Sequence, residues 1–491
     1  MHSTRRQFMA GSTAVLWSCL LPAESTVAPP ASFGALPLPR QLAWSQLETY
    51  AFLHFTVNTF TDFEWGKGDE DPNIFQPSAF DPDQIVLALK NGGMKAVILT
   101  CKHHDGFCLW PTKTTDHSVR SSSWKEGKGD VVRDISDAAR RHGLKFGVYV
   151  SPWDRNNANY GKPEYLPVYR AQITELLTNY GPIFEIWFDG ANGGDGYYGG
   201  AREKRTISKD YYEWPRIFEI VRNLQPEAVI FGTGGDIRWV GNEKGYAPET
   251  SWATYTQPGQ ADEKADVHAS ADWRTLAPVG VRMGEHWQPA ECDVSIRPGW
   301  FYHPAEDGKV RTPDDLMDLY FRSVGHGAGL LLNIPPNRQG LISSQDAAAI
   351  AEFHQRIEKQ FQRNLAMEAK MHASNVRGNH SPFAPERLVD GDRSTFWATD
   401  DDVHTPELVL DFQRPVTFDV IRLREAIALG QRIGAVVLDA WQDNAWVSIA
   451  NATSIGSCRL IRLERPVTTS RVRLRVTDCP KAIALSELGL Y

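Results

Sequence analysis

The stretch Phe184-Glu-Ile-Trp-Phe-Asp-Gly-Ala191 decides the fold that we expect for this chain. It is a mainly apolar run that ends in a carboxylate, Asp189, followed at once by a glycine. Apolar runs of this kind are typical of strands that are buried on both faces of a parallel sheet. In a closed parallel barrel, a side chain at the carboxyl end of a strand lies at the mouth of the site. The stretch therefore predicts a buried strand that delivers one acidic group to such a mouth.

Similar runs alternate with helical segments from about residue 45 to 340 of the 491-residue chain. The expected strands are Ala51–Phe55, Ala96–Thr100, Lys145–Val150, Ile183–Phe188, Ala228–Phe231 and Gly327–Asn333. The expected helices are Pro82–Asn91, Val131–His142, Glu164–Tyr180 and Tyr211–Leu224. At this length the alternation predicts an α/β fold, a (β/α)8 TIM-like barrel.

The pattern changes after residue 340. Ser343–Asn364 predicts one helix, and helical periodicity is absent from Ala373 onward. Short strands separated by turn signals are expected at Leu408–Phe412, Val420–Leu423, Ala435–Leu438, Arg459–Leu463 and Val472–Val476. We therefore expect an all-β sandwich of the jelly-roll kind at residues 367–491, after a barrel domain at residues 31–366.

The amino terminus predicts an export signal. Ser3-Thr4-Arg5-Arg6-Gln7-Phe8 precedes the apolar run Met9–Leu21, as in twin-arginine signals. The run is too short to anchor the protein permanently across a bilayer. We expect residues 1–30 to be the signal peptide, cleaved near residues 23–30, and a bacterial periplasmic or extracellular location.

The composition narrows the range of partners. The net charge is −8 and no basic block stands out, which argues against a nucleic-acid partner. The 16 Trp, 15 Tyr and 22 Phe residues fit either large cores or surfaces on which sugar rings stack. No CxxC or HExxH pattern occurs, so we expect no zinc site.

Asp189 at a strand end fits the cleavage of a glycosidic bond, which needs two carboxyl groups. One group attacks or stabilises the anomeric carbon, and the other protonates the leaving oxygen. The candidates for the second group are Glu243 and Glu291. A proton donor needs a raised pKa and therefore apolar rings nearby; Trp239 is available to Glu243, and Trp287 or Trp300 to Glu291. We favour Glu243, and the alternative for Asp189 is a helix cap.

Other polar residues also follow expected strands. Lys102-His-His-Asp-Gly-Phe107 follows the strand at Ala96, and Glu64-Trp65-Gly66 follows the first strand. Adjacent neutral imidazoles at a strand end can donate to sugar hydroxyls. Metal binding is a weaker alternative, because neighbouring side chains of a strand face opposite ways. Packing and capping remain the third possibility.

These motifs, taken in order, resemble those of a known family. They are His54, Glu64-Trp65, His103-His104-Asp105-Gly106-Phe107 with Trp110, Gly147-Val-Tyr149-Val-Ser151, Trp187-Phe-Asp189-Gly190 and Leu331-Leu-Asn333-Ile-Pro-Pro. The chain from about residue 45 to 345 thus resembles glycoside hydrolase family 29, the α-L-fucosidases. The resemblance implies a (β/α)8 barrel and a retaining, two-step mechanism that needs no cofactor or metal.

The resemblance also implies roles for single residues. Asp189 would be the nucleophile, and Glu243 the acid/base of a branch that prefers α-1,3 and α-1,4 linkages in Lewis-type glycans. The residues expected to hold the fucose are His54, Glu64, Trp65, His103, His104 and Tyr149. Glu291, Asp293 and Arg297 would grip a neighbouring galactose, and Trp300 is a further candidate substrate-binding residue in that stretch.

The tail resembles the discoidin-like, coagulation-factor type C sandwiches. The resemblance rests on Leu388–Thr399 and Ser486–Leu490. Many such domains bind sugars and some hold a structural Ca2+, for which Asp390 and Asp392 are candidate ligands. A buttress without a ligand is the alternative.

The sequence thus predicts an exo-α-L-fucosidase that acts on fucosylated oligosaccharides or glycoconjugates. Two alternatives remain open: a catalytically silent glycan-binding protein, and a related α-L-glycosidase such as an α-L-galactosidase.

Overall fold

The computed structural model describes residues 27–232, 234–256 and 276–491. Most of the expected signal, residues 1–26, lies outside the described residues. Within these ranges, none of the helices has both the length and the apolar character needed to cross a bilayer.

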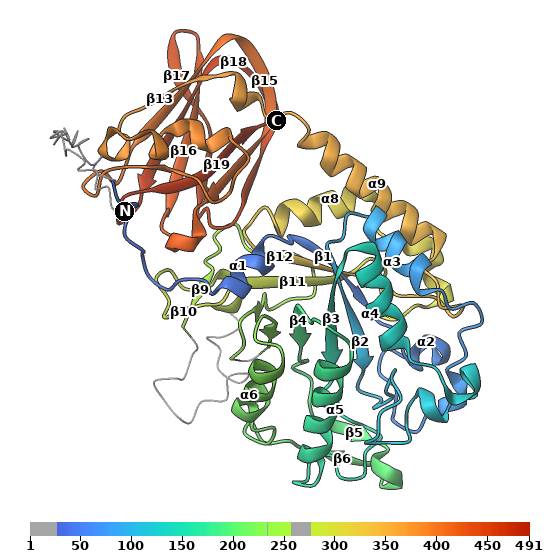
Figure 1. The fold of residues 1–491 in the computed structure, drawn as a ribbon. Coiled ribbons are helices and arrows are strands. Elements are labelled where there is room, and N and C mark those ends of the chain that lie inside the picture. Colours follow the sequence, from blue (N-terminus) through green and yellow to red (C-terminus); the bar gives the residue numbers. More distant parts are fainter. Residues whose placement is uncertain (1–26, 233, 257–275) are drawn as a thin grey trace, which may run out of the picture.

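A parallel barrel forms the larger domain (Figure 1). Its eight strands within the described residues are β1 (Thr49–Leu53), β2 (Ala96–Lys102), β3 (Lys145–Val150), β4 (Glu185–Trp187), β7 (Val229–Phe231), β8 (Arg238–Trp239), β11 (Ala290–Ser295) and β12 (Gly329–Asn333). Their hydrogen-bonded order is β7-β4-β3-β2-β1-β12-β11-β8. A parallel bridge from Phe231 to Ile237 brings the two end strands together, so the barrel is nearly closed. The expected TIM-like fold is confirmed.

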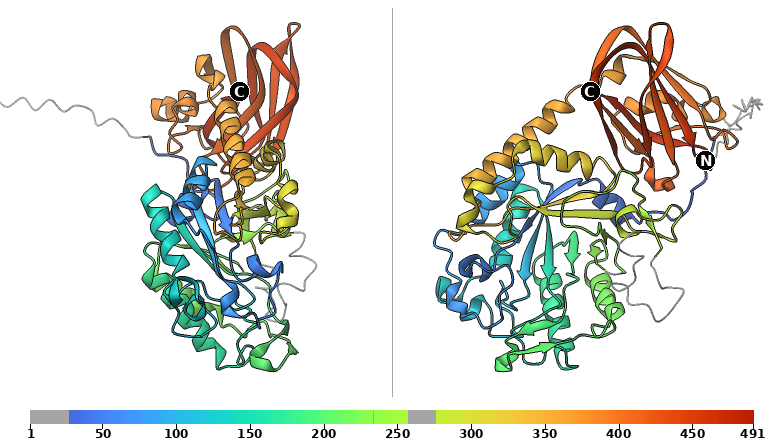
Figure 2. Two further views of the ribbon diagram at one scale, coloured as in Figure 1. Left: turned by 90° about the vertical axis from the view of Figure 1, so that its right-hand side faces the viewer. Right: turned by 180° about the vertical axis from the view of Figure 1, so that it is seen from behind.

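Helices cover the outside of the barrel (Figures 1 and 2). They are α3 (Pro82–Asn91), α4 (Val131–His142), α5 (Tyr165–Asn179), α6 (Trp214–Leu224), α8 (Pro313–Arg322) and α9 (Ser344–Gln360). Local chemistry fixes their ends. At α4, the Asp130 side chain accepts from the Arg133 backbone N–H, and Gly143 ends the helix in the left-handed conformation at φ 79°. These signals explain why the bounds of α3 and α4 were predictable to the residue.

A short helix, α1 (Pro39–Ser45), plugs the amino-terminal end of the barrel. The Gln41 amide donates to the carbonyl oxygens of Asp236 at 2.9 Å and Trp287 at 2.7 Å. Trp44 packs with Tyr50 in the apolar interior of the barrel. The interior is therefore sealed at this end, and only the opposite end is open to a ligand.

The smaller domain is an antiparallel β-sandwich, as expected. Its strands are β13 (Lys370–Ala373), β14 (Trp397–Ala398), β15 (Glu407–Glu425), β16 (Ala435–Gln442), β17 (Ala445–Thr453), β18 (Arg459–Asp478) and β19 (Ala484–Leu490). The order is β14-β19-β15-β18-β16-β17, with β13 on β15. Two pairs of expected short strands are merged into the long strands β15 and β18. A register shift between Asp411 and Val416 interrupts the burial pattern of β15, which made one strand look like two.

The two domains are joined by charged contacts. Glu48, directly before β1, accepts from Arg393 at 2.7 Å and from Arg424 at 2.8 Å, both in the sandwich. The Tyr320 hydroxyl of α8 donates to its other oxygen at 3.1 Å. Burial raises the pKa of Glu48, but Arg424 and Arg393 outweigh this effect and hold the pKa at about 2. The carboxylate is therefore charged at all ordinary pH values.

Replacing Glu48 with Gln should loosen the contact between the domains. Because the folded pKa lies below the ordinary 4.5, the charge stabilises the protein fully above pH 4.5 and progressively less toward pH 2. Glu48→Gln should lower the Tm by about 2–5 °C at pH 7. The difference from the unmodified protein should shrink as the pH falls to 3.

The matched control is Glu352→Gln in α9. Glu352 pairs with Arg356 at the surface, and such exposed pairs contribute little. Thermal unfolding at pH 7 and pH 3 measures both variants. An equal loss for the two variants, or a loss for Glu48→Gln that does not depend on pH, would contradict the assigned role.

Candidate functional site

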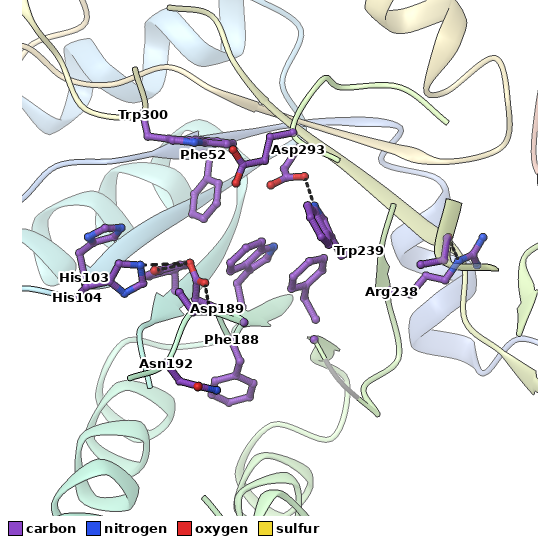
Figure 3. A pocket seen from close by; sticks show the side chains of 18 of the residues that line it. Phe52, His103, His104, Phe188, Asp189, Asn192, Arg238, Trp239, Asp293 and Trp300 are labelled. Carbon is purple, nitrogen blue, oxygen red and sulfur yellow. Dashed lines mark hydrogen bonds and ion pairs between the residues drawn. The ribbon is translucent and has the colours of Figure 1, made fainter. Parts of the chain in front are cut away.

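A cavity of about 400 Å3 opens at the carboxyl ends of the barrel strands (Figure 3). It is lined by aromatic rings and a few polar groups, as is usual for small-molecule sites. The candidate residues among its lining are His54, Glu64, Trp65, His103, His104, Tyr149, Asp189, Glu243, Asp293 and Trp300. They come from segments spread over about 250 residues of sequence, which the closed sheet brings together.

Asp189 lies two residues beyond the end of β4. The Tyr149 hydroxyl donates to its Oδ2 at 2.8 Å, and the Ala191 backbone N–H donates to its Oδ1 at 2.7 Å. His104 Nε2 lies 3.8 Å from Oδ2 (Figure 3). The next long helix, α6, begins only at Trp214, so Asp189 does not cap it. The side chain is 23% exposed, and a ligand in the cavity can reach it.

Glu243 supplies a second carboxyl group to the same cavity. Burial raises its pKa, and the carboxylates of Asp189 and Glu64 raise it further, while a hydrogen bond with the Trp300 side chain opposes them. The influence of Asp189 on Glu243 means that the two groups lie near each other. Glu243 and Trp300 also line a second cavity of about 400 Å3, so Glu243 stands at the boundary between two open spaces.

Three imidazoles line the cavity in their neutral form. Burial lowers the pKa of His54 to about 3 and that of His104 to about 4, and it lowers the pKa of His103 well below its ordinary value. His54 Nδ1 lies 2.8 Å from Asn333 Oδ1, and His104 Nδ1 lies 2.7 Å from Ser151 Oγ. His103 Nδ1 is buried and has no hydrogen-bond partner among the described residues.

Glu64, Trp65 and Trp300 form one side of the mouth. Trp65 is 52% exposed, although its ring contacts those of His104 and Trp153. The Glu64 carboxylate accepts from the Trp300 backbone N–H at 2.9 Å. Glu64 thus holds the loop that carries Trp300, and any contact with a ligand comes in addition to that role.

Asp293, in β11, also lines the cavity. It accepts from Trp239 Nε1 at 2.8 Å (Figure 3). Burial raises its pKa well above the ordinary value, and the neighbouring carboxylates of Glu291 and Glu243 raise it further. This raised pKa favours the protonated form of Asp293, which can donate a hydrogen bond.

Glu291 does not reach the cavity, which corrects the expectation that it grips a neighbouring sugar. Its side chain is wholly buried and accepts from the Tyr50 hydroxyl and from Trp187 Nε1. Glu291 and Asp293 point to the same side of β11, but Glu291 lies two residues, or about 7 Å, closer to the plugged end. At that depth the barrel interior is filled by side chains.

Arg297 also lies outside the first cavity. It lines the second cavity beside Trp300, and its guanidinium is bound by Asp346 and Asp307, each at 2.9 Å. Its contact with a neighbouring sugar stays a prediction.

Some lining residues were not anticipated. They are mostly apolar and include Phe52, Phe188, Trp214, Phe218 and Phe231. Three of them carried a signal in the sequence. Phe231 ends an expected strand, and Trp214 and Phe218 are four residues apart, on one face of α6. The sequence did not indicate that α6 packs close enough to the cavity for its side chains to line it.

The described residues contain no group of three or more His, Cys, Asp or Glu side chains arranged to hold a metal ion. The candidate calcium ligands Asp390 and Asp392 accept hydrogen bonds within their own turn. The donors include Thr395 Oγ1, at 2.7 Å from Asp390, and Ser394 N, at 2.8 Å from Asp392. Calcium binding in the sandwich stays a prediction.

Comparisons with known proteins match both domains. A model of the alpha-L-fucosidase family matches residues 40–359, and a model of the F5/8 type C domain matches residues 370–488. Alpha-L-fucosidase 1 of Arabidopsis thaliana is 40% identical over 463 residues, covering 93% of this chain and 88% of that protein.

Solved structures agree over nearly the whole chain. A putative alpha-L-fucosidase from Bacteroides thetaiotaomicron is 38% identical with a TM-score of 0.85, covering 94% of this chain and 98% of that one. A Ruminococcus gnavus family 29 fucosidase solved in complex with fucose is 31% identical with a TM-score of 0.85, covering 94% and 96%. The chain therefore belongs to glycoside hydrolase family 29, the α-L-fucosidases, and its barrel is followed along the chain by a discoidin-like F5/8 type C domain.

Proposed function

We propose that this α-L-fucosidase is a retaining exo-enzyme that removes terminal α-1,3- or α-1,4-linked L-fucose from branched glycans of the Lewis type. The observation that carries the proposal is the pair of carboxyl groups at one cavity, Asp189 and Glu243. Burial raises the pKa of Glu243, as a proton donor needs.

In the first step, Asp189 attacks the anomeric carbon of the fucose while the Glu243 carboxyl gives its proton to the glycosidic oxygen. The bond from carbon to leaving oxygen breaks, and an ester to Asp189 forms. In the second step, the Glu243 carboxylate takes a proton from water, whose oxygen attacks the same carbon. The ester bond breaks, and L-fucose leaves with its original anomeric configuration.

The surroundings of Asp189 suit a nucleophile. Burial raises the pKa of Tyr149 well above its ordinary value, so the phenol keeps its proton and donates it in the hydrogen bond to Asp189. A donor at Oδ2 orients the carboxylate and leaves lone pairs free to attack. His104 is neutral, so it places no positive charge beside Asp189 that would make the carboxylate a weaker nucleophile.

The remaining polar groups suit the hydroxyls of a single sugar. We propose that His54, His103 and His104 exchange hydrogen bonds with these hydroxyls, together with Glu64. Trp65 would cover the ring. The apolar part of the cavity would take the C6 methyl group that distinguishes fucose from galactose.

The second cavity supports a branched leaving group. Because Glu243 lies at the boundary of both cavities, the group that it protonates would extend from the first cavity toward the second. Asp293 and Trp300 lie near this boundary and are the residues that we propose for contact with the adjoining galactose. This arrangement favours substrates in which the fucosylated sugar carries a neighbour.

We also propose export through the twin-arginine signal at residues 1–30. From Ala28 onward the chain is part of the folded domains, since the Ala28 carbonyl accepts from Arg377 at 2.6 Å and the Phe33 N–H donates to the Leu429 carbonyl at 2.9 Å. These contacts support cleavage at the early end of the expected window.

Asp189→Ala should abolish turnover of an aryl α-L-fucoside. The expected loss in kcat is on the order of 10^4-fold or more, since the ester can no longer form. Steady-state kinetics and thermal unfolding are measured on the same preparation. Asp195→Ala, in the loop after β4, is the control and should keep full activity. Near-native turnover by the folded Asp189→Ala protein would rule out this nucleophile.

Glu243→Gln should separate substrates by their leaving groups. Turnover of fucosylated oligosaccharides should fall about 10^2- to 10^4-fold, whereas aryl fucosides with acidic leaving groups should lose far less in the first step. Glu243 must be protonated to act as the acid, so kcat/KM falls as the pH rises through its raised pKa. This fall in kcat/KM at high pH should be absent from Glu243→Gln. If the fall persists in the variant, Glu243 is not the acid.

The stereochemistry and the linkage can be tested together. Proton NMR of early reaction mixtures should show α-L-fucose before the β anomer accumulates, and the reverse order would refute retention. A panel of α-1,2, α-1,3, α-1,4 and α-1,6 fucosides should give the highest kcat/KM for the α-1,3 and α-1,4 linkages, and more so when the adjoining galactose is present. A preference for α-1,2 or α-1,6 would refute the proposed specificity.

A further inference from the structure

Two carboxyl groups meet inside the barrel, beneath the cavity. Glu185 of β4 and Glu291 of β11 are both wholly buried, and they lie close enough for the charge of Glu291 to raise the pKa of Glu185. Among the described residues, neither forms an ion pair with a lysine, arginine or histidine. Two buried carboxyl groups at close range, with no cation beside them, cannot both be ionised, so one of the pair carries a proton.

The surrounding donors decide which group carries the proton. Glu291 accepts from the Tyr50 hydroxyl and from Trp187 Nε1, the latter at 2.8 Å. Glu185 accepts from Trp44 Nε1 at 3.0 Å, while its other oxygen has no hydrogen-bond partner among the described residues. Two donors stabilise a carboxylate on Glu291, whereas a single donor leaves Glu185 as the neutral acid.

The electrostatic surroundings point the same way. Burial raises the pKa of both groups, but the charge of Glu291 and that of Asp236 raise the pKa of Glu185 well above its ordinary value. The donors of Tyr50 and Trp187 oppose the rise at Glu291. Asp293 is the other acidic group nearby, and its own pKa is raised.

Trp187 connects this pair to the reacting groups. Its indole lines the cavity, and its ring stacks on Phe231 at 4.1 Å and on Tyr149 at 5.3 Å between ring centres. Tyr149 in turn donates to Asp189. Trp187 also precedes Asp189 by only two residues, so its ring sets the path of the chain that ends in the nucleophile.

We propose that Glu291 is a positioning residue for catalysis: its carboxylate fixes the indole of Trp187 and thereby the arrangement of Tyr149 and Asp189. This role rests on the proposed nucleophile. It replaces the sugar contact expected for Glu291. It also predicts that substitutions of the same size at Glu185 and Glu291 have different effects on kcat.

The test compares Glu185→Gln with Glu291→Gln, two substitutions of the same size at the same depth. The amide of Glu185→Gln still accepts from Trp44 and is uncharged, like the protonated acid that it replaces, so kcat for an aryl fucoside should stay within about twofold. The amide of Glu291→Gln turns an N–H group toward groups that are themselves donors. Its kcat should fall on the order of 10- to 100-fold, with little change in KM.

A double-mutant cycle tests whether Glu291 acts through Trp187. Trp187→Phe removes the indole N–H, so adding Glu291→Gln to it should cost far less than in the unmodified protein. Equal losses for the two Gln variants, unchanged kcat in Glu291→Gln, or additive losses in the cycle would each overturn the proposal. If Glu291→Gln does not fold, Trp187→Phe alone must lower kcat about tenfold, and near-native kcat would overturn it.

Failure of the role proposed for Glu291 can be distinguished from failure of the proposed nucleophile. An active Asp189→Ala protein would refute the nucleophile assignment while leaving the coupling of Glu291 and Trp187 measurable. A non-additive cycle with an inactive Asp189→Ala protein supports both.

Discussion

Inward-pointing side chains of a closed parallel sheet must share one narrow interior, and this constraint governs the whole site. The plug of α1 and Trp44 covers one end of that interior, so polar groups at that end are satisfied by other groups of the protein. Groups at the carboxyl end meet open space instead. A difference of two residues along one strand therefore separates Glu291, which is part of the core, from Asp293, which lines the cavity.

The same interior sets the charge state of the site. Burial keeps His54, His103 and His104 neutral, and it favours the protonated form of Glu243. Neutral imidazoles can both donate to and accept from hydroxyl groups, as recognition of an uncharged sugar requires. A carboxylate in such a low-dielectric pocket stabilises the positive charge that develops at an anomeric carbon.

Much of this arrangement was predictable from the sequence, for local reasons. Caps and glycines bounded α3 and α4, and apolar runs located the strands whose ends carry His103 and Asp189. The sequence could not indicate depth, because Glu291 and Asp293 have equivalent places in the alternating pattern of β11. It also could not reveal that β15 continues through its irregularity, since the long-range pairing with β18 bridges the interruption. Nor could it show that Trp214 and Phe218 reach the cavity, which depends on how α6 packs.

Part of the sandwich packs into the apolar core of the barrel domain. Cys458 and Leu460 of the β18 region belong to the same apolar core as the barrel helices, and the Leu460 N–H donates to the Gly325 carbonyl at 2.9 Å. Tyr491, at the end of the chain, packs on Phe361 beyond α9. The sandwich also has an apolar core of its own, but these residues extend the core of the barrel into it. A substitution on either side of the boundary must therefore be tolerated by both domains.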